Sequence, residues 1–432
     1  MPRFLIKSLG CKVNQSESEA IADALKKGGL EETSPAVNSL TSDICIINTC
    51  TVTQKASMQS RQAIRRAIRA NPGARIIVTG CYAATEPDEI KAINGVHSII
   101  TNSRKNKIPQ IALAHIQQNP HDAKSNLYGQ LEHDDQPPNS QKRTRPFLKI
   151  QDGCNAFCTY CIVPYARGRS RSMPPARVLD KIDKISKKGF HEVVLTGIHL
   201  GVFGLDLNPA SSLYELLGKV EKASPACRIR LSSIEPRELT DNIINLVAKS
   251  DIFCPHFHIP LQSGDNSILK KMGRPYDREF FRKLVLKIHK AIPEAAIGVD
   301  ILAGFPGETE AAFYNTCSLI KELPVTYLHV FPFSARNSTP AAEYPDQVSP
   351  SALKLRTGEL RDLGTLKKKE FYSRSIGKKA KILIEGKRAE SGALKGLTSN
   401  YIPVQVAGCD ELKNSIMEVR ITNSNAYFTS GI

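Results

Sequence analysis

The sequence predicts an α/β protein that ends in a small all-β domain. Two series of apolar, strand-like segments alternate with helical segments, over residues 1–116 and 147–374. Such alternation favours parallel sheets covered by helices. Residues 375–432 carry only short β signals separated by Gly and Asn, which favours a small barrel. With the polar stretch 117–146 as a linker, the 432-residue chain is expected to form three domains.

The first series predicts a small parallel α/β domain. Strands are expected at 4–8, 43–48 and 75–79, with helices at about 16–28 and 55–70 between them. Parallel strands joined by crossover helices place their carboxyl ends on one edge of the sheet. We therefore expect the residues that follow these strands to lie close together.

The second series is longer and leaves two architectures open. Its six strand candidates are 147–151, 192–196, 228–233, 256–260, 297–302 and 327–331. Helical segments separate them, among them 176–188, 239–249 and 277–291, and an amphipathic helix is expected at 351–374. Periodicity alone does not separate an open doubly wound sheet from a partial barrel. In either case the active site is expected at the carboxyl ends of the strands.

The charge balance points to a polyanionic partner. The formal net charge is +17, and nucleic acid is the polyanion that such proteins most often bind. Three basic groups are candidates for RNA binding, although each on its own could be an ordinary solvated face. They are Arg61, Arg65 and Arg69 on one expected helix, Arg167 and Arg169, and Lys378 and Lys379 at the start of the last domain. No apolar run is long enough for a membrane span, so a cytoplasmic protein without membrane contact is expected.

A cysteine triplet follows the strand at 147–151. Cys154, Cys158 and Cys161 have the spacing C-x3-C-x2-C, so one short loop offers three thiolates. Three thiolates can each hold one iron of a cubane cluster and leave the fourth iron open for a substrate. The alternative is a structural zinc site, which needs four ligands, and a distant fourth ligand could complete it.

Three further cysteines each follow an expected strand of the first domain. They are Cys11, Cys50 and Cys81, and each lies beside turn-forming residues. Because parallel strands end on one edge, the three could share a second metal site. The alternative is three separate buried thiols at the starts of loops.

The triplet Cys154–Cys158–Cys161 resembles that of the radical S-adenosylmethionine superfamily. The resemblance implies a partial (β/α)6 barrel and a [4Fe-4S] cluster that reduces S-adenosylmethionine to a 5′-deoxyadenosyl radical. Tyr160 is similar to the aromatic residue that lies near the adenine. Glycine-rich or polar turns after the later strands agree with cofactor binding at the strand ends. The residues implied there are Thr196, Gly197, Ser233, Glu235, Gln262 and Gly304.

Over nearly the whole chain, the sequence resembles the methylthiotransferases. Their pattern has an N-terminal domain with three cysteines, a radical core and a C-terminal TRAM-type RNA-binding barrel. The resemblance implies a second [4Fe-4S] cluster on Cys11, Cys50 and Cys81 that carries the transferred sulfur. It also implies a tRNA substrate and an electron donor such as flavodoxin or ferredoxin.

The short sequence motifs around the N-terminal cysteines resemble those of one branch of this family most. Gly10-Cys-Lys-Val-Asn14-Gln and Thr79-Gly-Cys-Tyr82 imply methylthiolation at C2 of N6-threonylcarbamoyladenosine, at position 37 next to the anticodon. Two alternatives keep the chemistry but change the substrate, to isopentenyladenosine in tRNA or to ribosomal protein S12. A third, of another class, is a non-catalytic, zinc-containing RNA-binding protein.

Overall fold

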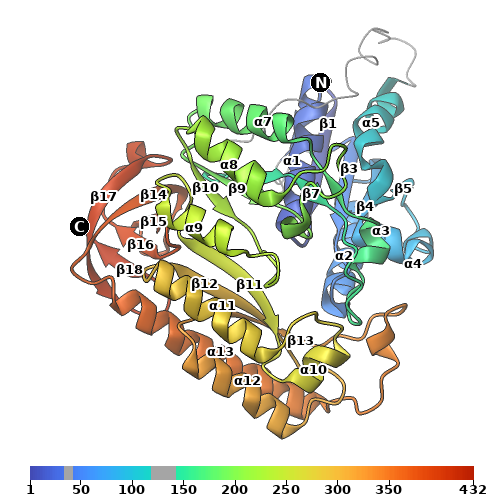
Figure 1. Ribbon diagram of the computed structural model, residues 1–432. Helices are drawn as coiled ribbons and strands as arrows, with labels where there is room; N and C mark the ends of the chain where they lie inside the picture. The colour runs from blue at the N-terminus through green and yellow to red at the C-terminus, as the bar shows by residue number, and fades with distance from the viewer. Residues whose placement is uncertain (34–41, 118–142) are drawn as a thin grey trace.

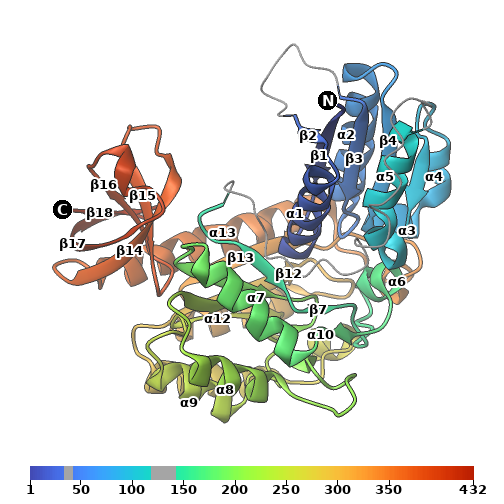
Figure 2. The same cartoon turned by 90° about the horizontal axis from the view of Figure 1, so that it is seen from above.

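The computed structural model describes residues 1–33, 42–117 and 143–432 (Figure 1). The linker predicted at 117–146 therefore falls almost wholly outside the described residues. Figure 2 shows three bodies: an N-terminal α/β layer, a central barrel and a small C-terminal barrel. Within the described ranges, no helix is both long and apolar enough to cross a membrane.

The N-terminal body is a five-stranded sheet in the order β2-β1-β3-β4-β5, and all of its pairings are parallel. The strands are β1 (Arg3–Ser8), β2 (Glu31–Glu32), β3 (Ile44–Thr49), β4 (Arg75–Gly80) and β5 (Ser98–Ile100). Its helical elements are α1 (Lys12–Lys27), α2 (Gln54–Ala70), α3 (Cys81–Thr85), α4 (Pro87–Lys91), η1 (Asn102–Lys107) and α5 (Ile108–Gln117). Apolar clusters cover both faces of the sheet, as expected of parallel strands.

Helix α1 begins at Lys12, earlier than the start predicted at residue 16. The residues of its first turns are mostly polar. In the structure Asn14, Ser16, Glu17 and Ser18 are buried, because this end of the helix packs against the central body. Ser16, for example, donates a hydrogen bond to the carbonyl of Phe147 at 3.0 Å.

The central body is a partial barrel of six parallel strands. They are β6 (Phe147–Lys149), β9 (Glu192–Thr196), β10 (Arg228–Leu231), β11 (His256–Gln262), β12 (Ala296–Ala303) and β13 (Tyr327–Pro332). Two three-stranded sheets, β10-β9-β6 and β11-β12-β13, meet at a parallel bridge between Ile229 and Phe253. The strands thus lie side by side in chain order, so every crossover advances in the same direction. That order places the helices on one outer face and curves the sheet into a barrel, which excludes the doubly wound alternative.

The outer layer of this barrel is helical (Figure 1). Its helices are α7 (Pro175–Lys187), α8 (Leu213–Ala223), α9 (Asp241–Lys249), α10 (Asn266–Lys271), α11 (Arg278–Ala291), α12 (Glu310–Glu322) and α13 (Pro350–Ser373). Shorter elements are α6 (Val163–Arg167), the hairpin of β7 (Gln151–Asp152) with β8 (Arg171–Ser172), η2 (Leu200–Val202) and η3 (Pro340–Ala342). One apolar core runs through the barrel wall and the helices.

The last body is a closed barrel in the order β14-β15-β16-β18-β17. Its elements are β14 (Lys379–Arg388), β15 (Leu394–Thr398), β16 (Pro403–Val406), η4 (Asp410–Leu412), β17 (Ile416–Ser424) and β18 (Thr429–Gly431). It docks on the central barrel through two arginines of β10. Arg228 donates to the carbonyl of Leu397 at 2.8 Å, and Arg230 donates to that of Ser399 at 2.9 Å.

Candidate active site

The loop after β7 holds the first three cysteines in a tight turn. Gly153 enters it with φ +76, and a Cβ there would lie 2.0 Å from the carbonyl oxygen of Arg169, so only glycine fits. Cys161 donates its backbone N–H to the carbonyl of Cys158 at 2.9 Å. Burial raises the pKa of the Cys161 thiol to about 12, and the neighbouring thiols of Cys158 and Cys154 act in the same direction. The three sulfurs therefore share one space, in which a cationic metal centre would favour the thiolates.

Charged side chains from other strand ends contact these sulfurs. His199 Nδ1 lies 3.3 Å from the Cys154 sulfur, and Glu238 Oε1 lies 2.6 Å from the other ring nitrogen of His199. Arg274 donates to the Cys158 sulfur at 3.3 Å and also pairs with Glu235. Hydrogen bonds to cluster-binding sulfurs tune the reduction potential of iron–sulfur centres, so these residues are placed to do so.

Cys11, Cys50 and Cys81 also converge, each at the end of a neighbouring strand. Cys50 and Cys81 are buried, whereas Cys11, before the first turn of α1, is exposed. Burial raises the pKa of Cys50 to about 11, and the thiols of Cys81 and Cys11 add to this effect. Gly80 has φ +99, and a Cβ there would lie 2.3 Å from the Thr49 carbonyl oxygen. This glycine lets β4 turn sharply and brings Cys81 beside Cys50.

Neither cysteine triplet is closed around a single small ion. Sulfurs bound to one tetrahedral zinc lie about 3.8 Å apart, because each Zn–S bond is about 2.3 Å. Among the residues described, the one group of three ligand atoms all within 4.8 Å of one another is His258, Asp300 and His329. Neither cysteine triplet is as compact. Both triplets offer three thiolate donors, which is the donor set that iron–sulfur groups require.

The short helix α6 connects the two triplets. It follows Cys161 directly and packs against α3, which begins at Cys81 (Figure 2). Asn102 donates to the α6 carbonyl of Ala166 at 2.8 Å, and its amide nitrogen lies 3.9 Å from the Cys81 sulfur. The two triplets are therefore parts of one site.

The structure places the predicted cofactor-binding residues at the carboxyl ends of the barrel strands. Thr196, Ser233, Gln262 and Gly304 end or follow β9, β10, β11 and β12 respectively. Gln262 has φ +68 and lies at an irregularity in strand pairing. The ring of Tyr160 packs edge-on against Phe305.

Some of the predicted RNA-binding residues are exposed, whereas others are buried or half-buried and contact neighbouring protein side chains. Arg65, Arg69, Arg169, Lys378 and Lys379 are exposed. Arg61 is half-buried and bridges Tyr82 and Glu89. The prediction that Arg167 lies on an RNA-binding surface was wrong. This residue is 3 % exposed and forms ion pairs with Glu17 and Asp152. Its neighbours in the basic run are solvated, which is why the sequence pattern misplaced it.

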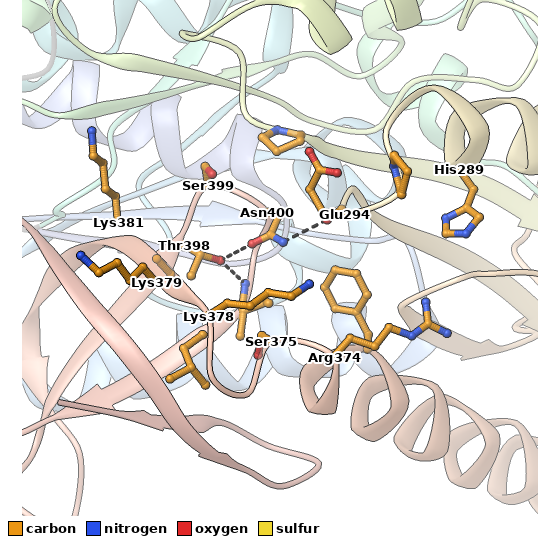
Figure 3. A pocket seen from close by; sticks show the side chains of 16 residues that line it. His289, Glu294, Arg374, Ser375, Lys378, Lys379, Lys381, Thr398, Ser399 and Asn400 are labelled. Carbon is orange, nitrogen blue, oxygen red and sulfur yellow. Dashed lines mark hydrogen bonds between the residues drawn. The ribbon is translucent and has the colours of Figure 1, made fainter.

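Figure 3 shows a groove where the C-terminal barrel meets the central body. Arg374 and Lys378, between α13 and β14, line it together with Lys381 of β14 and His289 of α11. The floor is fixed by Asn400, which donates to the carbonyl of Glu294 at 3.0 Å. This basic groove has the charge that a nucleic-acid backbone requires.

Several polar side chains that contact the cysteine loop were not singled out from the sequence. His199 lies in the turn Thr196-Gly-Ile-His199, which was selected for its glycine, and Arg274 follows Gly273 in an unremarkable stretch. Gln151 joins two loops, since its Oε1 accepts from the His199 backbone N–H at 2.8 Å while its amide donates to Gly153 O, also at 2.8 Å. The only sequence signal for these three residues was the histidine two positions after the strand-end Gly197.

The comparisons with known proteins agree with this geometry. Residues 148–320 match the Radical SAM superfamily, and residues 3–101 match the family described as Uncharacterized protein family UPF0004. The structure resembles the radical S-adenosylmethionine methyltransferase TsrM from Kitasatospora setae, with TM-score 0.58 and 14 % identity, over 79 % of this chain and 77 % of that one. Fold and cysteine loop together define a radical S-adenosylmethionine enzyme.

Relatives that align over the full length of the chain define its family more closely. The threonylcarbamoyladenosine tRNA methylthiotransferase MtaB of Bacillus subtilis (strain 168) is 40 % identical, over 100 % of this chain and 96 % of that protein. The tRNA-2-methylthio-N(6)-dimethylallyladenosine synthase of Clostridium botulinum (strain Okra / Type B1) is 33 % identical, over 99 % and 96 %. The chain belongs to the methylthiotransferase family of radical S-adenosylmethionine enzymes. This family uses S-adenosylmethionine and [4Fe-4S] clusters.

Proposed function

We propose that the protein adds a methylthio group to C2 of N6-threonylcarbamoyladenosine at position 37 of tRNA. Three relatives bearing that activity in their names support the substrate. They are 40 %, 35 % and 38 % identical, and each aligns over at least 93 % of this chain. Relatives named for dimethylallyladenosine are 33 % identical. The proposal rests mainly on one observation: the threonylcarbamoyladenosine relatives align over nearly the whole chain and are more identical to it than the dimethylallyladenosine relatives are.

In this proposal Cys154, Cys158 and Cys161 hold one [4Fe-4S] cluster, and Cys11, Cys50 and Cys81 hold the other. When bound, these clusters and S-adenosylmethionine supply the one-electron chemistry and the sulfur that side chains cannot provide. The protein's own side chains hold the cysteine loops in position. Gln151 fixes the loop of the first triplet against the His199 turn by the two hydrogen bonds described above.

Three domains share the work. The N-terminal domain, 1–116, carries the second cysteine set, and 147–374 form the radical core. The barrel at 375–432 binds RNA, supported by the basic groove at its junction with the core. Arg65, Arg69, Arg169, Lys378 and Lys379 bind the phosphate backbone.

The reducing electron comes from a small acidic carrier such as flavodoxin or ferredoxin. The net charge of +17 supports electrostatic attraction to such a partner. A tRNA substrate sets the reaction in the cytoplasm. Because attraction between opposite charges is screened by salt, donor-driven turnover is expected to slow as ionic strength rises.

The test is nucleoside mass spectrometry of bulk tRNA from a strain that lacks the gene. We expect loss of 2-methylthio-N6-threonylcarbamoyladenosine with accumulation of its unthiolated precursor, and recovery on complementation. The isopentenyladenosine derivative is expected to persist. Persistence of the threonylcarbamoyl product with loss of the isopentenyl one would assign the chain to the other substrate.

A further inference from the structure

A basic cavity lies where the N-terminal sheet, the central barrel and the C-terminal barrel meet. Its volume is about 500 Å³. Lys12, Arg145, Arg230 and Lys387 contribute cations to its lining, and Tyr401 contributes an aromatic ring. The cavity is therefore built from all three parts of the chain and is suited to an anionic, partly aromatic ligand.

Both of these arginines are already paired. Arg145 forms an ion pair with Glu385 at 2.8 Å, and Arg230 forms one with Glu192 at 2.7 Å. Within the parts of the chain that the structure describes, Lys12 and Lys387 form no hydrogen bond or ion pair, and of these two only Lys12 is half-buried. Asp300 and Glu192 act on Lys12 only from beyond ion-pair distance, and Arg230 and Arg145 are also close, so this half-buried ammonium has no directly paired carboxylate.

The position of Lys12 connects the cavity to the chemistry. It directly follows Cys11, and it opens helix α1, whose N-terminal dipole also favours an anion. Tyr401 is the aromatic ring in the cavity lining. It is held from behind by the buried His256, at a tilt and with ring centroids 4.5 Å apart. An aromatic ring of this kind can stack on a flipped-out purine base.

We propose that Lys12 binds the carboxylate of the threonylcarbamoyl group and so determines which modified adenosine is accepted. This inference rests on the proposed function. In adenine, C2 and the carbon that bears N6 flank the same ring nitrogen. A base whose C2 approaches Cys11 therefore brings its N6 substituent toward the adjacent Lys12, whose long side chain can reach it. An apolar isopentenyl group would leave the ammonium unpaired, and a buried unpaired charge disfavours binding.

An RNA phosphate offers the same anionic chemistry, so the test separates the two sources. Three anticodon stem-loops of one sequence would carry adenosine, threonylcarbamoyladenosine or its methyl ester at position 37. Their affinities for the anaerobic, cluster-loaded protein would be measured by fluorescence anisotropy at fixed salt. Wild-type protein is expected to prefer the free carboxylate, with the ester bound no better than adenosine.

Lys12→Gln is expected to lower affinity for the threonylcarbamoyl stem-loop about tenfold and to leave the other two unchanged. Lys12→Arg, which keeps the charge, should keep the preference. Lys387→Gln, at the rim of the same cavity, should weaken all three stem-loops alike, as a phosphate contact does. Iron content of each variant would exclude an effect through Cys11.

Two results would overturn the inference. An unchanged preference in Lys12→Gln would mean that the ammonium does not contact the carboxylate. Equal loss for all three stem-loops would assign Lys12 to a phosphate. Either result leaves the proposed function intact if the deletion strain has lost the thiolated threonylcarbamoyl nucleoside, so the two hypotheses fail separately.

Discussion

Arg167 donates to Glu17 at 3.0 Å across the boundary between the central barrel and the N-terminal sheet. The arginine side chain is 0 % exposed and that of Glu17 is 7 % exposed. Lys105 and Lys149 pair with the same carboxylate. Burial raises the pKa of Glu17, but the three cations outweigh it and hold the pKa well below its usual range. One carboxylate thus fixes the two cysteine sets relative to each other.

Glu17→Gln is expected to destabilise the metal-free chain by about 3–5 kcal/mol, because the buried Lys105 loses its paired carboxylate while Arg167 and Lys149 keep only Asp152. Urea unfolding followed by circular dichroism measures this loss. Asp183→Asn, which removes the partner of the exposed Lys187, serves as the control and should leave the midpoint unchanged. Equal midpoints for all three proteins would show that the buried network does not hold the interface.

The cysteine sets are predicted to have separate duties. Cys158→Ala should abolish cleavage of S-adenosylmethionine, whereas Cys50→Ala should leave cleavage largely intact and block methylthiolation. Product analysis by liquid chromatography distinguishes these outcomes. Cys409→Ala is the control, since Cys409 is exposed and lies in the C-terminal barrel. The two-cluster assignment is wrong if Cys158→Ala and Cys50→Ala lose cleavage equally in folded protein.

Much of this site was predictable because its geometry is local. Cys154, Cys158 and Cys161 lie within one loop, so their spacing alone indicates a shared metal group. Cys11, Cys50 and Cys81 were found because parallel strands end on one edge. The pairing of Arg167 with Glu17 could not be found, since it joins residues 150 positions apart and depends on how two bodies dock.

In the central body too, some features could be predicted from the sequence and others could not. Periodicity located all six barrel strands, but it carries no information on strand order. The sheet forms a barrel because β10 lies beside β11. A parallel bridge between Ile229 and Phe253, and a hydrogen bond from the Ile234 N–H to the His258 carbonyl, make this contact. His199 and Arg274 likewise reach the cysteine sulfurs only once the barrel has closed.

Gly80→Ala is predicted to prevent assembly of the second cysteine set. The new Cβ would collide with the backbone of Thr49, so β4 and Cys81 must shift. Gly73→Ala is a matched control, because Gly73 has φ +84 but no atom near its Cβ position. It should cost only about 1–2 kcal/mol from the left-handed backbone. Iron content and thermal unfolding of both variants measure the difference, and similar behaviour of the two would contradict the prediction.

The pairing of Glu192 predicts a pH dependence of stability. Burial raises its pKa, but Arg230, Arg228 and Arg145 outweigh burial and lower the pKa to about 2. A depressed carboxyl pKa stabilises the fold above the unfolded value of about 4.3, and this contribution is lost as pH falls toward 2. The difference in unfolding free energy between wild type and Glu192→Gln, about 3 kcal/mol at neutral pH, should therefore shrink between pH 5 and pH 2. A difference that stays constant with pH would refute the prediction.

The groove of Figure 3 predicts a salt-dependent contribution to tRNA binding. Replacing Lys378, Lys379 and Lys381 together by Gln should weaken binding and reduce the slope of log affinity against log salt by about 2. Filter binding across a salt series measures the slope. Lys283→Gln, on the exposed face of α11, is the control. An unchanged slope in the triple variant would remove the C-terminal barrel from the RNA-binding surface.

Iron content and paramagnetic resonance of the anaerobically reconstituted protein test the central assignment most directly. We expect iron and sulfide for two cubane clusters in the wild type. We expect half of that in the variant with Cys11, Cys50 and Cys81 changed to Ala, and half in the one with Cys154, Cys158 and Cys161 changed. Zinc in place of iron, or a wild type that holds only one cluster, would contradict the two-cluster assignment.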